Sequence, residues 1–148
     1  MKKLKLTAIL ACIFMVNVAS MCSSDDNSSS SSSTTTTQVT TTVTNGNWSV
    51  TRYNENGANH NSYFTGYAFT FASNGSLTAV GSSNQSGSWS TYTDSGKTKM
   101  DISFSATDGP FESISDDWDV LSATSSKVEL KHTSGGDGSI DYLTFEKI

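Results

Sequence analysis

The chain has 148 residues, of which 34% are hydrophobic, and this length and composition are typical of one small globular domain. Its formal net charge of −5 makes a nucleic-acid partner improbable, because an acidic surface repels phosphate. Both cysteines, Cys12 and Cys22, lie in the first 22 residues, so no cysteine is left for a disulfide or a thiolate metal site in the remainder.

The first residues have the pattern of a secretory signal. Three lysines among the first five residues precede an apolar run over 6–18, which is too short for a spanning helix. A cysteine directly after such a run is typical of the first residue of a mature bacterial lipoprotein. We therefore predict a cleaved signal peptide over 1–21 and lipidation of Cys22, with ordinary signal-peptidase cleavage after Ala19 as the alternative.

The segment after Cys22 predicts an export tag and a linker. The short acidic cluster resembles the tag of surface-exported lipoproteins of the Bacteroidetes; its residues are Ser24, Asp25, Asp26 and Asn27. The alternative is that these carboxylates only solvate the chain. Residues 22–44 are almost entirely polar and are expected to form a disordered linker. We expect a protein anchored in the outer membrane and facing the cell surface, with a periplasmic-facing or a secreted protein as the alternative.

From residue 45 the pattern changes to the two-residue alternation of β-strands. Each run is short and rich in aromatic and β-branched residues, as strands require. Eight strands are expected, over 48–53, 63–72, 77–80, 89–92, 100–104, 118–121, 128–132 and 140–145. Turn signals such as Asn74-Gly75 separate them, and one helical turn is expected over 110–114.

The number of strands and their short connections predict an all-β fold. An antiparallel meander with alternating apolar positions has to hide its edges, and closure into a small up-and-down barrel does so. We predict an eight-stranded barrel over 45–148, with a two-sheet sandwich as the alternative. Two longer connections interrupt the meander, over 54–62 and 107–117.

Several motifs follow one another along the globular part. Gly46-Asn47-Trp48 resembles the Gly-x-Trp motif with which lipocalins open their first strand. An ordered set of aromatic segments follows it, over 63–71, 87–89, 116–120 and 141–145. Together these segments resemble the lipocalin-like domain of Bacteroidetes lipoproteins. The resemblance covers residues 45–148 and implies a barrel that binds a small ligand.

Six aromatic residues of the predicted strands are candidates to line such a ligand site. They are Tyr63, Tyr67, Phe69, Trp89, Phe104 and Trp118. The competing interpretation is that they are core residues, because buried aromatic rings contribute large apolar areas to any small barrel.

Neither a metal site nor catalysis is predicted. Several acidic residues precede or begin one strand, but they lack EF-hand spacing and are interpreted as a solvated cap; they are Asp108, Glu112, Asp116, Asp117 and Asp119. The two histidines, His60 and His132, show no zinc-binding spacing. We therefore expect no cofactor, no metal and no enzymatic activity.

Two functional hypotheses remain open. The first is a membrane-anchored binding module for a small hydrophobic or amphipathic ligand or a glycan fragment. The second is an interaction lipoprotein with a solid core, which binds a protein partner through the connections 54–62 and 107–117. In both, the expected partner of acylated Cys22 is the lipid bilayer, and the protein is expected to be monomeric.

Overall fold

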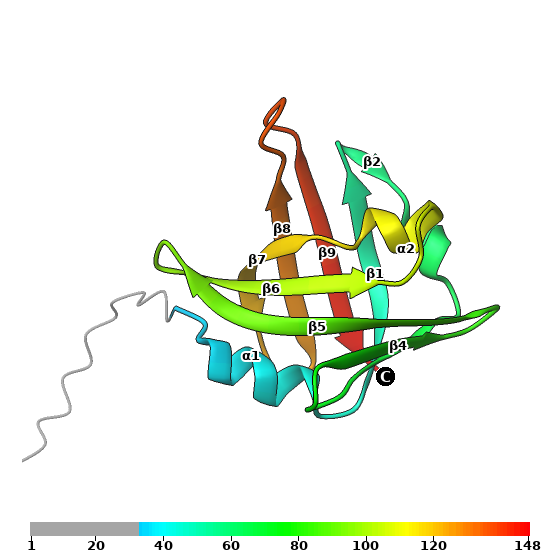
Figure 1. Cartoon of the computed structure of the whole chain (residues 1–148), viewed down its shortest axis with the longest axis horizontal. Helices are drawn as coiled ribbons and strands as arrows, with labels where there is room; N and C mark the ends of the chain where they lie inside the picture. Colours follow the sequence, from blue (N-terminus) through cyan, green and yellow to red (C-terminus); the bar gives the residue numbers. More distant parts are fainter. Residues whose placement is uncertain (1–32) are drawn as a thin grey trace, which may run out of the picture. The chain divides into compact units, whose positions relative to one another are not determined.

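The computed structural model describes residues 33–148 and consists mainly of β-strands (Figure 1). The predicted signal peptide, Cys22 and the predicted export tag lie outside the described residues. The strands are β1 (Asn47–Glu55), β2 (Ala58–Asn59), β3 (Ala68–Phe71), β4 (Ser76–Val80), β5 (Asn84–Asp94), β6 (Lys97–Phe104), β7 (Asp117–Ala123), β8 (Lys127–Thr133) and β9 (Ile140–Lys147). They are accompanied by helices α1 (Thr36–Val43) and α2 (Gly109–Ser113) and by the 3₁₀ helix η1 (Asn61–Phe64).

The strands form a closed antiparallel up-and-down barrel. Neighbours in the sheet follow chain order from β3 to β9, and β1 pairs with both β3 and β9, which closes the barrel with eight strands. The short β2 is a ninth strand, paired with the end of β1. The predicted barrel is confirmed, and the sandwich alternative is wrong, because a single sheet closes on itself through β1 and β9.

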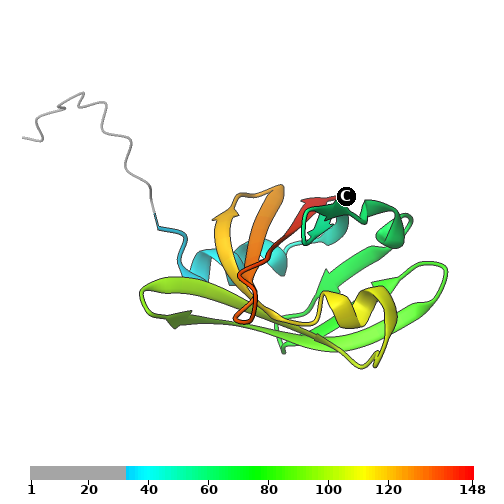
Figure 2. The ribbon, with the colours of Figure 1, turned by 90° about the horizontal axis from the view of Figure 1, so that it is seen from above.

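The barrel has two ends, which we call the mouth and the base. The mouth is the end where β1 and β8 end and where β7 and β9 begin. The base is the opposite end, where β1 begins and α1 lies (Figures 1 and 2). The predicted helical turn at 110–114 is confirmed as α2, which buries Phe111.

The tight turns have the backbone that their residues favour. Ser95 and Gly96, between β5 and β6, both have positive φ, at 51° and 79°. Gly75, between β3 and β4, has φ of 86°, which suits a residue without a Cβ atom. The predicted turn residues are therefore the ones that reverse the chain.

The interior is filled by the inward-pointing side chains of the strands. Aromatic rings pack edge-to-face across it. The Phe145 ring, for example, lies 5.3 Å between centroids from the Phe69 ring and 5.3 Å from the Phe71 ring. An eight-stranded barrel is just wide enough for such side chains to fill it. The indole N–H groups are also satisfied, since Trp48 donates to the Val43 carbonyl and Trp118 to the Ile114 carbonyl.

Two expectations about local structure are wrong. Residues 36–43 were expected within a disordered linker, yet they form α1, because Val39 and Val43 on one face of the helix are buried against the base. The predicted strand over 63–72 begins only at Ala68. Tyr63 belongs to η1 and is 48% exposed, since Gly66, with φ of 82°, turns the chain before β3 begins.

Candidate functional site

The two long connections predicted from the sequence, 54–62 and 107–117, meet at the mouth. Together with the ends of β8 and β9 they surround a hollow of about 340 Å³. Four carboxylates line it, from Glu55, Glu112, Asp116 and Asp141, with His132 among them. The other lining residues are Asn56, Ser113, Ser115, Ser134 and Ser139. We call this hollow the acidic mouth, because no Lys or Arg is among the described residues that line it.

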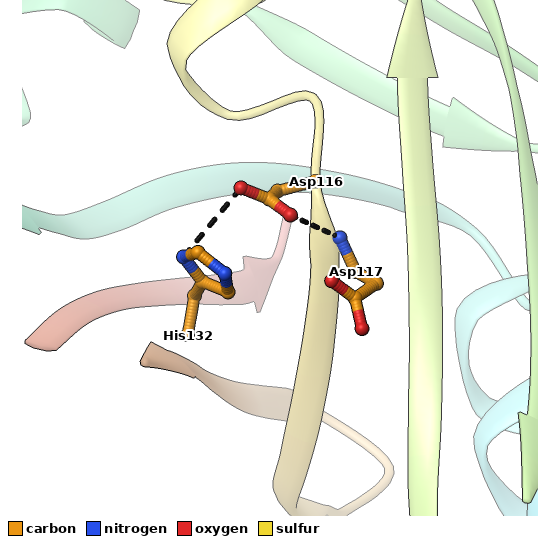
Figure 3. A group of neighbouring side chains, drawn as sticks. All are labelled: Asp116, Asp117 and His132. Carbon is orange, nitrogen blue, oxygen red and sulfur yellow. Dashed lines mark hydrogen bonds and ion pairs between the residues drawn. The ribbon is translucent and has the colours of Figure 1, made fainter. Parts of the chain in front are cut away.

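The sheet register brings His132 and the acidic side chains together. His132 and Asp141 are direct partners in the pairing of β8 with β9. Nδ1 of His132 lies 3.5 Å from Oδ2 of Asp116 (Figure 3). The same nitrogen lies 3.8 Å from Oδ2 of Asp141. The His132 ring meets the buried Trp118 ring edge-on at 6.0 Å between centroids, so Trp118 forms part of the packed layer beneath the acidic mouth.

Asp116, Asp117 and His132 are the described side chains best placed to hold a metal ion. One ligand atom of each lies within 4.8 Å of the others. Asp117, however, is already paired with Lys99, whose Nζ is 3.0 Å from its Oδ2. This hydrogen bond lowers the pKa of Asp117. A cation at this position would compete with the Lys99 ammonium group for Asp117.

The acidic residues of β7 belong instead to a neutralised network on the outside of the barrel. Nζ of Lys99 lies 2.8 Å from Oδ1 of Asp119, and Nζ of Lys97 lies 2.9 Å from Oδ2 of the same carboxylate. Burial raises the pKa of Asp119, but hydrogen bonds from Lys99 and Lys97 outweigh it and leave that pKa lowered. Two lysines thus balance Asp117 and Asp119 here. In the acidic mouth, the basic side chains that lie within 4 Å of Glu55, Asp116 and Asp141 among residues 33–148 are histidines.

An aromatic pair, of exposed Tyr63 and half-buried His60, lies beside Glu55 at the rim of the acidic mouth. Tyr63 and His60 stack with centroids 4.9 Å apart and planes only 16° from parallel. Nε2 of His60 is 3.9 Å from Oε2 of Glu55, which links this pair to the lining of the hollow. Below them, burial and the nearby Glu55 raise the pKa of Tyr53, so its phenol stays neutral beside the carboxylates.

Of the six predicted ligand residues, only Tyr63 lies exposed at this rim. The other five are buried in the barrel: Tyr67, Phe69, Trp89, Phe104 and Trp118. Their polar atoms have partners within the protein, such as the Ala72 carbonyl for the Trp89 indole and the Ser82 and Ser83 hydroxyls for Tyr67. They serve the core, and a role for them in ligand binding stays a prediction.

The sequence interpretation missed the carboxylates of the mouth as a group. Glu55, Asp116 and Asp141 are far apart in the chain. The closure of β1 on β9 and the pairing of β8 with both β7 and β9 bring them together. Their shared feature in the sequence is a position next to a strand terminus. Many other polar residues of a β-protein also lie next to strand termini, so this position alone does not identify the site.

Comparison with models of protein families, with curated protein sequences and with solved structures gave no match. The chain is therefore assigned by its fold alone, as an eight-stranded β-barrel of a form compatible with lipocalin-like binding proteins. Within residues 33–148, no helix has the length and apolar character needed to cross a bilayer.

Proposed function

We propose that this chain is a membrane-anchored binding module that holds a glycan fragment at the acidic mouth of its barrel. The observation that supports this most is the hollow itself, with four carboxylates and no Lys or Arg among its lining residues. Beside its lining residue Glu55, the exposed ring of Tyr63 stacks on His60. Polar groups converge on this hollow from several strands and loops at once.

The chemistry of the mouth suits a hydroxyl-rich ligand. Carboxylates accept hydrogen bonds from hydroxyl groups, and such charge-assisted bonds are the stronger ones. Glu55 and Asp141 come from adjacent strands, while Asp116 faces them from the start of β7. The flat ring of Tyr63, 48% exposed, offers a stacking surface beside them.

The same geometry selects among ligands. An apolar ligand would need space in the interior, which buried rings such as Phe69 and Phe104 occupy, with 6.2 Å between their centroids. An acidic sugar would be repelled by the carboxylates of the mouth. The preferred ligand is therefore a neutral or amino-sugar oligosaccharide.

Isothermal titration calorimetry with a panel of neutral, amino and sulfated oligosaccharides tests this proposal. We expect Asp141→Asn and Tyr63→Ala each to weaken binding of the preferred sugar at least tenfold. Glu146→Gln is the matched control, because it removes an exposed carboxylate at the other end of β9 and should leave affinity unchanged. Tight binding of sulfated sugars, or equal loss in all three variants, would contradict the proposal.

The anchor forms part of the same proposal. The described chain begins at the base, next to α1, so a tether attached there leaves the mouth at the far end of the barrel (Figure 1). Such a tether would present the acidic mouth to ligands outside the bilayer. Acyl chains on Cys22 would supply the membrane affinity, whereas Asp25 and Asp26 would act only as a sorting signal read by a receptor.

Two variants test the lipid anchor and the sorting signal separately. Cys22→Ala should abolish metabolic labelling with a fatty-acid analogue. Replacing Asp25 and Asp26 with Ala should keep the label but protect the domain from protease added to whole cells. Labelling that survives Cys22→Ala argues against the anchor, and continued access of protease after the double substitution argues against surface export by this tag.

A second candidate function is recognition of a protein partner, and it is favoured by the way the connections 54–62 and 107–117 join at one end of a filled barrel. Replacement of both connections by short Gly/Ser loops should then remove a partner that co-purifies with the intact protein from outer-membrane extract. Retention of that partner after replacement would exclude this surface.

A further inference from the structure

Helix α1 has a sequence that does not favour a helix. Seven of its eight residues are Thr or Val, with Gln38 as the exception. β-Branched side chains lose rotamer freedom in a helix and lower its stability. Eight residues are also fewer than the roughly 12–15 that an isolated helix needs to form in water. α1 therefore depends on the barrel for its structure.

Contacts with the base hold α1 in place. Val39 and Val43 are fully buried there. The Trp48 indole N–H donates to the Val43 carbonyl at 2.9 Å, and the Gln38 side-chain amide donates to the Ala123 carbonyl at 2.9 Å. None of these bonds belongs to a strand ladder, and the pairing of β1 with β9 that closes the barrel does not include α1.

We infer that α1 is a strap that docks on the base of the barrel and leaves it as one unit while the barrel remains folded. When α1 leaves, its helix unfolds, because both the valine contacts and the bond from Trp48 to the Val43 carbonyl are lost. The base then exposes the Trp48 ring and the apolar surface that Val39 and Val43 cover. The docked strap thus covers a second surface, which is apolar and lies at the opposite end from the acidic mouth.

Hydrogen exchange of the full chain tests the separate opening of α1. The amides of Val39 and Thr44 donate to the Thr35 and Thr40 carbonyls within this segment. We expect them to exchange at least tenfold faster than the amides of the β1–β9 ladder, with little dependence on mild denaturant. Exchange of both groups at one rate, rising together with denaturant, would show that α1 opens only with global unfolding and would overturn the inference.

A pair of substitutions on α1 tests what its opening exposes. Val39→Asp places a charge in the buried interface and should shift the strap to the open state, whereas Thr41→Asp places the same charge on the exposed side of the same helix. We expect Val39→Asp alone to raise acrylamide quenching of tryptophan fluorescence and binding of the dye ANS, with the β-sheet circular dichroism retained. The rise in quenching should disappear in a Trp48→Phe background. Unchanged quenching in Val39→Asp, or loss of its sheet signal, would refute a strap that moves independently.

Discussion

The packing of Phe111 is the sharpest test of a filled barrel. Its ring on α2 meets four other rings, with centroid distances of 4.9 Å to Phe104, 5.0 Å to Tyr67, 5.4 Å to Phe64 and 6.1 Å to Phe69. The side chain is buried and belongs to the main hydrophobic core. Phe111→Ala therefore removes the central ring of this aromatic group and leaves a cavity that its neighbours cannot easily fill.

The expected loss of stability is large. Truncation of a buried Phe to Ala costs about 3–5 kcal/mol in the free energy of unfolding. At about 4 °C per kcal/mol for a domain of this size, the melting temperature should fall by roughly 12–20 °C. Phe111→Leu keeps most of the apolar volume and should cost less than about 1.5 kcal/mol. Urea denaturation and calorimetry of the three proteins measure both quantities.

The cavity should also be detectable by ligand binding. Apolar cavities of this kind stay dry and accept small aromatic molecules. Indole should therefore raise the melting temperature of Phe111→Ala and leave that of the unmodified protein unchanged. A loss below about 1 kcal/mol in Phe111→Ala, or equal stabilisation of both proteins by indole, would mean that the barrel already holds an open apolar cup and that the reasoning about a filled interior is wrong.

Two further predictions concern the strands. Burial raises the pKa of Asp101, and the negative charge of Asp117, its cross-strand neighbour, raises it further. The folded state therefore loses stability as pH rises from about 3.8 through that raised pKa. Asp101→Asn removes this loss and should raise the melting temperature at pH 7 but not at pH 3; an equal rise at both would exclude the electrostatic cause. In Gly87→Ala the new Cβ would overlap the Ser103 carbonyl of the adjacent strand, at an expected cost of about 1–3 kcal/mol by urea denaturation. A Cβ at Gly136 would lie 4.0 Å from the Ser134 hydroxyl oxygen, an ordinary contact, so Gly136→Ala should change stability by less than about 0.5 kcal/mol. Equal stability of the two glycine variants would contradict the close approach of β5 and β6.

Alternation and turn chemistry were sufficient to predict the barrel. Runs such as Met100, Ile102 and Phe104 place every second side chain in the core, and this pattern holds only for strands with one buried face. Turn residues such as Asn74-Gly75 then set antiparallel neighbours. Closure followed from the cost of open edges, which is a property of every sheet of this kind.

Helix α1 was not predicted because its stability comes from tertiary contacts. Its local sequence is polar and β-branched, which is typical of a linker, and the only signal of a buried face is the spacing of Val39 and Val43 by four residues. Tyr63 was misplaced for the opposite reason: the aromatic alternation continues through it, although the backbone turns at Gly66. In α1 tertiary packing outweighed the local pattern, and at Tyr63 a turn of the backbone did.

The candidate site was predictable only in part. The sequence indicated the two connections that form the mouth, because their length interrupts an otherwise regular meander. It did not indicate which polar residues within them face one another, since that depends on the register that pairs His132 with Asp141 and on the position of Asp116 before β7. The register of each strand pair depends on the whole barrel and not on one segment of the sequence.

The central claim is that the ligand binds at the acidic mouth, and amide NMR spectra of the protein titrated with the preferred oligosaccharide test it most directly. We expect chemical-shift changes at Asn56, Asp116, His132 and Asp141, with no change at Trp48 and Val128 near the base. Changes centred on the base or on interior residues such as Phe69, or no change with any sugar of the panel, would contradict the claim.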